Sequence, residues 1–143
     1  MLKVWFPGTD DMEDYGLGNT QWVNDNVTIS NDGKLGKCLN FNGSNSRLST
    51  TNFNLSNEWS FCFWAKCNNA SSGWMALWAL GDDNDRNVTA GYFLIPTQSR
   101  SQISFNGTYN SNLSLPSPTE WTHYAGSWDG TKLIYYINGT QVY

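Results

Sequence analysis

The feature that most constrains the fold is an aromatic-rich segment late in the chain, residues 120–139. It contains two runs of aromatic and β-branched residues, the types that are enriched in strands. Asp129 and Gly130 separate the runs, and Asn138 and Gly139 follow the second. Both dipeptides supply the positive φ angles that tight hairpins require. We therefore predict a β-meander whose side chains alternate between two faces of a sheet.

Short apolar runs and turn residues recur along the rest of the chain, about every 8–12 residues, as in a sandwich or barrel. Turns are expected at Asp32-Gly33 and Asn106-Gly107, and no helical period of useful length is present. We predict an all-β fold, an antiparallel β-sandwich with jelly-roll topology. Its strands are expected at 1–7, 21–23, 26–29, 36–41, 47–50, 59–67, 74–80, 90–95 and 102–105, before the meander.

The composition of two of these runs also indicates which faces of the strand are covered. The run at 74–80 is apolar throughout, as expected for a central strand that is covered on both faces. The run at 59–67 alternates, which places Phe61 and Phe63 on one face and Cys62 and Trp64 on the other. The chain has three cysteines, so they cannot all pair with one another. We expect Cys62 to be a buried free thiol within its apolar run.

Charge and hydropathy exclude several classes of partner. The formal net charge of −4 offers no basic patch for nucleic acid or anionic lipid. No run approaches the roughly 18 apolar residues that insertion into a membrane requires. The first residues lack the apolar core of a signal peptide. We expect a protein that is made and assembled inside a cell, or one from which a signal has been removed.

Several separated segments resemble, in order, the laminin-G-like jelly rolls of the concanavalin A-like lectin superfamily. The segment at 120–139 carries E-W-T-H and then Y-x-N-G, and the segment at 33–44 carries G-K-x-G and then F-x-G-S. Residues 2–7, 14–19 and 59–66 match further strands and a loop. Domains of this family continue for several strands after the N-G turn. The resemblance therefore implies that residues 1–143 are a single laminin-G-like sandwich domain that lacks its last strands.

Pentraxins, a related group, add two implications. Their conserved disulfide would join the positions of Cys62 and Ala125, and the alanine implies that this bridge is absent here. Their calcium-binding loop resembles the loop at 82–85 by order and context. Its oxygen-bearing side chains are of the type that Ca²⁺ prefers, and the alternative is an ordinary solvated turn. We predict Ca²⁺ as a cofactor at Asp82, Asp83, Asn84 and Asp85, with further ligands expected beyond Tyr143.

Aromatic residues near this acidic loop are candidates for carbohydrate binding. Their rings offer flat apolar faces to sugars, and Asn and Asp in nearby loops offer hydrogen-bond partners. The candidates are Trp74, Trp78 and Tyr92. For each of them the alternative is a place in the core of the sandwich.

Catalysis has little support in the sequence. The three glutamates, Glu13, Glu58 and Glu120, do not form the E-x-D-x-x-E arrangement of glucanases that share this fold. Nothing places two carboxylates at the separation that a retaining glycosidase needs. His123 is the sole histidine, and we expect it to be buried and hydrogen-bonded rather than to act as a general base. We predict that the protein is not an enzyme.

Together these observations favour a non-catalytic, lectin-like adhesion module that binds cell-surface carbohydrate, such as a host-surface polysaccharide. The alternative is a structural or decoration protein of a virus capsid or tail, which would act through contacts with virion proteins or through self-association. Laminin-G-like modules are common on phage virions. The resemblance therefore implies a location on the surface of a phage head or tail, and an extracellular location is the alternative if a signal was removed. We expect no nucleic-acid partner and no membrane insertion.

Overall fold

The computed structural model describes residues 16, 20–50, 57–67, 75–82, 87–95, 100–105, 108–114 and 119–143. Between 75 and 114, the side chains described are those of residues 76–79, 91 and 103. The chain forms two compact units, Met1–Ser56 (unit 1) and Asn57–Tyr143 (unit 2). The strand predicted at 1–7 lies outside the described residues, and the single domain predicted over 1–143 stays a prediction.

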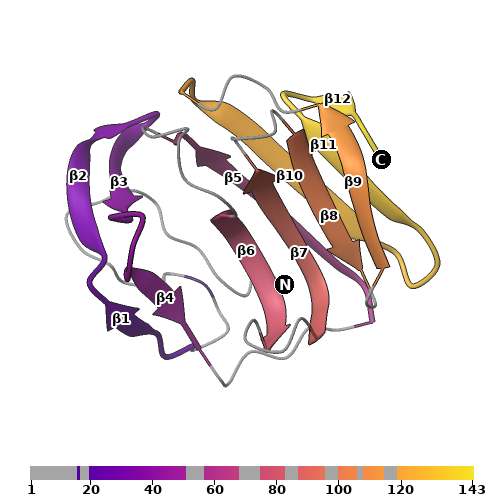
Figure 1. Ribbon diagram of the computed structural model, residues 1–143, viewed down its shortest axis with the longest axis horizontal. Coiled ribbons are helices and arrows are strands. Elements are labelled where there is room, and N and C mark those ends of the chain that lie inside the picture. Colours follow the sequence, from indigo (N-terminus) through magenta and orange to yellow (C-terminus); the bar gives the residue numbers. More distant parts are fainter. Residues whose placement is uncertain are drawn as a thin grey trace. The chain divides into compact units, whose positions relative to one another are not determined.

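Unit 1 contains two small antiparallel sheets of two strands each (Figure 1). One sheet pairs β1 with β4, and the other pairs β2 with β3. β3 and β4 lie on the runs predicted at 36–41 and 47–50, whereas β1 and β2 begin two residues later than the runs predicted at 21–23 and 26–29 and extend beyond them. Their bounds are Val23–Asp25 (β1), Thr28–Gly33 (β2), Gly36–Asn40 (β3) and Arg47–Ser49 (β4).

The turn between β2 and β3 lies two residues later than the sequence indicated. Asp32 and Gly33 belong to β2, and the turn is formed by residues 34–35. A Cβ atom on Gly33 would lie 2.6 Å from the carbonyl carbon of Lys37. The predicted turn was therefore wrong for a physical reason: this glycine permits two backbones to approach closely.

Unit 2 contains a first antiparallel sheet with the order β12-β11-β10-β5. β10 pairs along its length with β5 on one side and with β11 on the other. The meander predicted at 120–139 is thereby confirmed. The bounds are Trp59–Ala65 (β5), Thr122–Trp128 (β10), Leu133–Ile137 (β11) and Thr140–Gln141 (β12).

The two glycine dipeptides of the meander make different turns. Asn138 and Gly139 have φ angles of 48° and 80°, and they form a two-residue loop because Ile137 pairs directly with Thr140. Positive φ at both central residues is the signature of a type I′ turn. Gly130 also has a positive φ of 89°. Its loop is longer, however, and spans the four residues 129–132.

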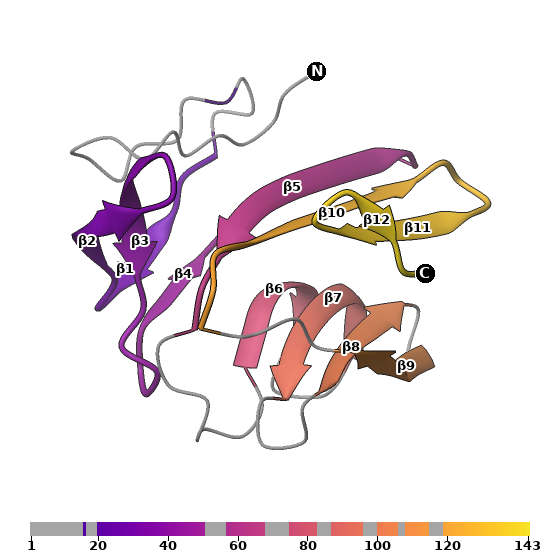
Figure 2. The same ribbon diagram turned by 90° about the horizontal axis from the view of Figure 1, so that it is seen from above.

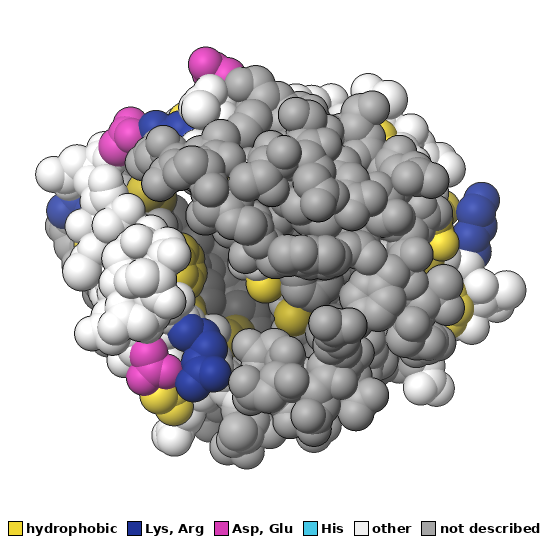
Figure 3. Space-filling view, viewed as in Figure 1, with side chains coloured by type: hydrophobic (Ala, Val, Ile, Leu, Met, Phe, Trp, Pro, Cys, Tyr) yellow, Lys and Arg dark blue, Asp and Glu magenta, His cyan; other side chains and the backbone are white. Residues whose placement is uncertain are grey.

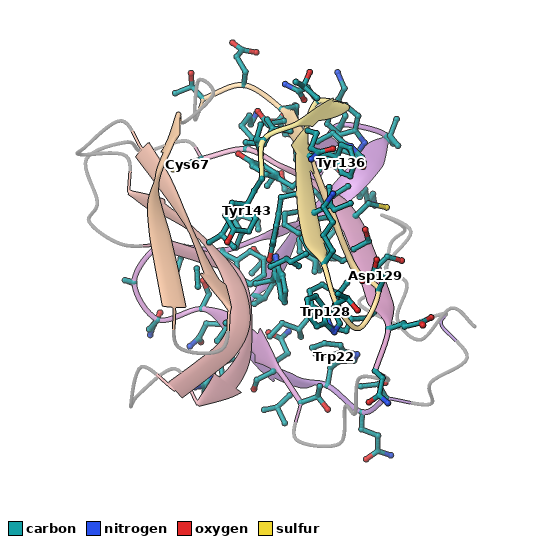
Figure 4. All side chains as sticks on the ribbon, turned by 90° about the vertical axis from the view of Figure 1, so that its right-hand side faces the viewer. Trp22, Cys67, Trp128, Asp129, Tyr136 and Tyr143 are labelled. Atoms are coloured by element: carbon teal, nitrogen blue, oxygen red, sulfur yellow. The ribbon has the colours of Figure 1, made fainter. Side chains whose placement is uncertain are left out.

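The longer loop is closed by the carboxylate of Asp129. Its Oδ1 accepts hydrogen bonds from the backbone N–H groups of Lys132 at 2.7 Å and Thr131 at 2.9 Å. These two bonds, with that from Lys132 the stronger influence, hold the pKa of Asp129 below its ordinary value. Figure 4 shows Asp129 next to Trp128 at this end of the hairpin.

The second sheet of unit 2 is a simple meander, β6-β7-β8-β9. β9 was not predicted, because Asn and Ser have low strand propensity. The turn predicted at Asn106-Gly107 lies outside the described residues, and the residues on either side of it, Phe105 and Thr108, are paired. The bounds are Met75–Asp82 (β6), Asn87–Ile95 (β7), Arg100–Phe105 (β8) and Thr108–Ser114 (β9).

The apolar strand β6 is an end strand in the part of the chain that the structure describes, not the central strand that its composition indicated. Its register shifts between Ala76 and Trp78. Leu77 and Trp78 both pack against the core although they are consecutive, whereas Ala76 and Ala79 are exposed. The uniform apolarity thus reflects an irregular strand rather than two covered faces.

The two sheets of unit 2 pack face to face, as Figure 2 shows. The ring of Phe61 lies at the centre of the contact, 4.5 Å from the ring of Trp78 and 5.6 Å from that of Tyr135 between centroids. Burying one large apolar side chain of this kind contributes about 1.5–3 kcal/mol. The buried members of the cluster are Ile103, Tyr124, Leu133, Tyr135 and Ile137.

β5 alternates as predicted, with Phe61 and Phe63 toward the core and Cys62 and Trp64 exposed on the outer face of the first sheet. Cys62 is therefore not buried, and that prediction was wrong because the apolar run has an outer face. Cys62 forms no disulfide and pairs in register with Ala125. The strand alignment that the pentraxin comparison implied is thus confirmed, with an alanine at the position opposite Cys62.

Candidate functional site

The described residues form a polar hollow in unit 1, about 410 Å³ in volume and open to solvent. Much of this volume faces solvent, so the hollow is a shallow surface site rather than an enclosed cavity. In Figure 3, basic and acidic side chains meet over the region of β1 and β4. The polar hollow is lined by Asp25, Asn26, Ser44, Asn45, Ser46 and Arg47.

One wall of the polar hollow is held by the turn after β1. The side chain of Asn24 accepts a hydrogen bond from the backbone N–H of Val27 at 2.8 Å and donates one to its carbonyl oxygen at 3.1 Å. Val27 itself is buried. Asn26 has a φ of 57°, a left-handed conformation that asparagine tolerates better than most residues. These contacts fix the backbone that carries Asp25 and Asn26.

The opposite wall is a loop organised around Asn42. Its Oδ1 accepts hydrogen bonds from the backbone N–H groups of Ser44 at 2.9 Å, Asn45 at 3.0 Å and Ser46 at 3.2 Å. Its Nδ2 donates to Oδ1 of Asn45 at 2.7 Å, and its own N–H donates to Oγ of Ser46 at 2.7 Å. Gly43 permits the reversal with a φ of 73°. The loop is therefore formed before any ligand arrives.

An ion pair joins the two walls. Asp25 and Arg47 are cross-strand partners at the end of the β1–β4 ladder, and Nη2 of Arg47 lies 3.2 Å from Oδ2 of Asp25. The two side chains are 42% and 59% exposed, respectively. Exposed pairs of this kind contribute about 1 kcal/mol or less to stability. The Asp25–Arg47 pair matters more for binding, because it places a hydrogen-bond acceptor and a donor side by side.

Several polar groups of the hollow remain available to a ligand. Within the described part of the chain, no protein group is hydrogen-bonded to the side-chain amide of Asn26 or to Nδ2 of Asn45. The guanidinium of Arg47 uses Nη2 for Asp25 and keeps further N–H donors. The arrangement offers donors and acceptors within one small volume, which suits a ligand rich in hydroxyl groups.

The sequence places the chain in a family. Residues 42–143 match the family described as the concanavalin A-like lectin/glucanases superfamily. The chain belongs to this superfamily. Its match begins at Asn42, so it includes the loop of the polar hollow and all of unit 2. No curated protein and no solved structure is significantly similar to the chain.

Membership confirms the family and the antiparallel β-sandwich class that the sequence predicted. The name of the superfamily covers both lectins, which bind sugars, and glucanases, which cleave them, so membership suggests a sugar-related module. The described residues include no helix, and thus none that could span a membrane.

Among the aromatic residues predicted to bind sugar, the structure describes the ring of Trp78 alone. It packs against the core, with its ring centroid 4.5 Å from that of Phe61 and 5.8 Å from that of Trp59. This position favours the core alternative for Trp78. Tyr92 is its backbone partner on β7, and its side chain is outside the described part. Trp74 also lies outside the described residues. Sugar binding by the three stays a prediction.

The predicted calcium ligands begin at the end of β6. Asp82 is the last residue of this strand, and Asp83, Asn84 and Asp85 lie outside the described residues. Elsewhere in the described part of the chain, no three His, Cys, Asp or Glu side chains gather as metal ligands. Calcium at this loop therefore stays a prediction.

His123 lies on the outer face of the first sheet rather than in the core. Its side chain is half-buried, and its ring centroid is 5.1 Å from that of Trp64, its cross-strand partner. The expectation of a buried histidine was wrong because Tyr124, the next residue along β10, points inward instead. Trp64 is 38% exposed. Tyr136 of β11 pairs with Ala125, two residues after His123 on β10, so strand alternation places it on the same face.

Sequence reasoning missed the polar hollow. The available local signal was the run of Asn, Gly and Ser at 42–46, residue types that are typical of turns. The ion pair had no such signal. Asp25 and Arg47 are 22 positions apart and become neighbours only because β1 pairs with β4.

Proposed function

We propose that the chain is a non-catalytic, lectin-like adhesion module that binds cell-surface carbohydrate in the polar hollow. The observation that carries this proposal is the mixture of N–H donors and oxygen acceptors on two preformed walls. A sugar hydroxyl both donates and accepts hydrogen bonds, so it can use both kinds of group. Walls that are already ordered reduce the entropic cost of binding. Membership in a superfamily of lectins and glucanases agrees with this function.

The carboxylate of the hollow supports binding rather than catalysis. Glycosidases use two carboxyl groups that lie roughly 5–9.5 Å apart on either side of the scissile bond. Asp25 is the single carboxylate among the described residues that line the hollow, and it is paired with Arg47. A single carboxylate leaves no partner to act as the second acid, base or nucleophile.

A glycan array tests the lectin function directly. The protein is applied with Ca²⁺ and, separately, with a chelator, because we also propose Ca²⁺ as a structural cofactor of the loop at 82–85. Binding to at least one class of glycan is expected, and a lower melting temperature in chelator is expected if calcium holds that loop. A failure to bind any glycan in both conditions would contradict the proposal.

A matched pair of variants tests the location. Asn45→Ala removes one of the two side-chain amides of the hollow, and we expect a loss of at least tenfold in glycan affinity. Asn31→Ala removes an equally polar side chain from an exposed position of β2 that does not line the hollow, and affinity should be unchanged. Equal effects of the two substitutions would place the binding site elsewhere.

We further propose that the module is displayed on a phage head or tail, with a host-surface polysaccharide as its glycan. Its laminin-G-like character motivates this location, since such modules are common on virions. An extracellular protein whose signal was removed is the alternative. Detection of the chain in purified particles by mass spectrometry would test the virion location, and its absence from them would contradict it.

A second candidate function is a structural or decoration protein that acts through protein contacts. It is motivated by exposed large apolar side chains of the described residues, which lie in both units and could each contact a partner protein. Size-exclusion chromatography with light scattering distinguishes the two. A monomer that binds sugar supports the lectin, and an oligomer that binds none supports the structural role. The exposed side chains are Val23, Leu35, Phe41, Trp64 and Tyr143.

A further inference from the structure

The polar hollow has a charge arrangement that bears on which saccharides it takes. Arg47 and Asp25 are the charged groups among its described lining residues, and they face each other at 3.2 Å. The remaining lining side chains, those of Asn26, Ser44, Asn45 and Ser46, are neutral. The hollow therefore presents paired, opposite charges rather than a field of one sign.

Each partner of the pair opposes the ligands that the other would attract. An arginine alone binds carboxylates well, because its guanidinium matches their two oxygens. Here the carboxylate of Asp25 occupies one side of that guanidinium and would repel a second carboxylate placed beside it. A cationic ligand meets the corresponding repulsion from Arg47. An uncharged polyol meets neither.

We propose that the Asp25–Arg47 pair makes the hollow selective for uncharged saccharides, and that Asp25 is the residue that excludes acidic ones. The inference rests on the proposed carbohydrate-binding function and deepens it. Neighbouring hydroxyls of a sugar accept from the N–H groups of Arg47 and donate to the carboxylate of Asp25. A uronic acid in the same place puts its carboxylate against that of Asp25.

The experiment replaces the carboxylate without changing its size. The whole chain and Asp25→Asn are immobilised and titrated with mannan, galactan and dextran as neutral probes, and with alginate and polygalacturonate as acidic probes. The wild-type protein should bind a neutral probe and reject the acidic ones. Asp25→Asn should shift the ratio of acidic to neutral affinity by tenfold or more, and the gained binding should weaken as salt is added.

Controls separate selectivity from general effects of charge. Asp32→Asn removes an equal charge from an exposed position of β2 outside the hollow, and the ratio should not change. Arg47→Gln should lose affinity for the neutral probe and gain none for the acidic probes. If Asp25→Asn does not fold, as judged by circular dichroism, Asp25→Ser makes the same test.

Each outcome decides a different point. A wild-type protein that binds none of the five probes overturns the inference, whereas the glycan array decides the proposed carbohydrate-binding function. Wild-type binding to a neutral probe with an unchanged ratio in Asp25→Asn overturns the inference alone. A wild-type preference for alginate or polygalacturonate also overturns it. Neutral binding that converts to salt-sensitive acidic binding in Asp25→Asn is the result we expect.

Discussion

Each of the two units is stabilised internally by a different kind of interaction. In unit 1, the polar hollow is built by asparagine and serine side chains that bond to nearby backbone groups, as Asn24 does to Val27 and Asn42 does to its loop. In unit 2, two sheets are held by aromatic rings, with Phe61 against Trp78 and Tyr135 at the centre. Polar local bonds shape one region, and apolar packing across strands stabilises the other.

Because of this difference, ligand binding and folding stability should depend on different residues. An exposed ion pair such as Asp25–Arg47 contributes about 1 kcal/mol or less, whereas a buried aromatic side chain contributes about 1.5–3 kcal/mol. Substitutions in the hollow should therefore alter ligand binding with little effect on folding. Substitutions in the core should do the reverse.

The largest effect is expected at the centre of the sandwich. Tyr135 is 1% exposed, and Tyr135→Ala leaves a large cavity between the sheets, so the free energy of unfolding should fall by about 3–5 kcal/mol in a urea titration. Tyr136→Ala is the matched control, because this neighbour on β11 points to the outer face. It should cost about 1 kcal/mol or less. Equal losses would show that the two faces of the sheet are not distinguished as described.

The register of the first sheet of unit 2 can be tested by introducing a disulfide bond. Cys62 and Ala125 are directly opposite each other on β5 and β10, so Ala125→Cys should form a disulfide with Cys62 on oxidation. A bridge of this loop length should raise the free energy of unfolding by about 2–4 kcal/mol. Thiol titration and urea unfolding, with and without reductant, measure both effects. Ser127→Cys faces Ser60 and should gain no bridge to Cys62, and a bridge there would contradict the register.

A smaller loss of folding stability is expected at Gly126, where the backbone of β10 lies against the ring of Phe61. A Cβ atom on Gly126 would lie 2.7 Å from Cε1 of Phe61, so Gly126→Ala must displace that ring. Thermal or urea unfolding should show a cost of about 1–3 kcal/mol. Adding Phe61→Leu, which removes the clashing edge of the ring, should reduce the further loss caused by the alanine. A cost that is unchanged in this background would contradict the contact.

The smallest effect is expected at the exposed turn between β10 and β11, and it depends on pH. The pKa of Asp129 is lowered in the folded protein, so its charge stabilises the fold above the ordinary carboxyl pKa of 3.8. That contribution is lost as the pH falls through the lowered folded pKa. Unfolding curves of the wild type and Asp129→Asn should therefore differ at neutral pH and converge in acid. A difference that persists unchanged in acid would contradict this role.

The sequence predicted the features that depend on neighbouring residues and missed those that depend on residues far apart in the chain. The alternation of Phe61 and Cys62 and the turn at Asn138-Gly139 follow from neighbouring residues, and the structure confirms both. The register of Cys62 with Ala125 came from the family resemblance, since nothing local determines it. The polar hollow required Asp25 and Arg47 to meet across the β1–β4 pair. Polar three-residue strands carry no signal of their partner, so this site emerged from the structure alone.

The central claim is that saccharide binds in the polar hollow, and nuclear magnetic resonance of the isotope-labelled protein tests it most directly. A glycan identified on the array is titrated while the backbone amide signals are followed. We predict that the signals of Asn26, Asn45 and Arg47 shift with saturation, while those of Tyr135 in the core and Trp64 on the outer sheet face stay in place. Saturable shifts at Trp64 with none at Asn26, Asn45 and Arg47 would contradict the account.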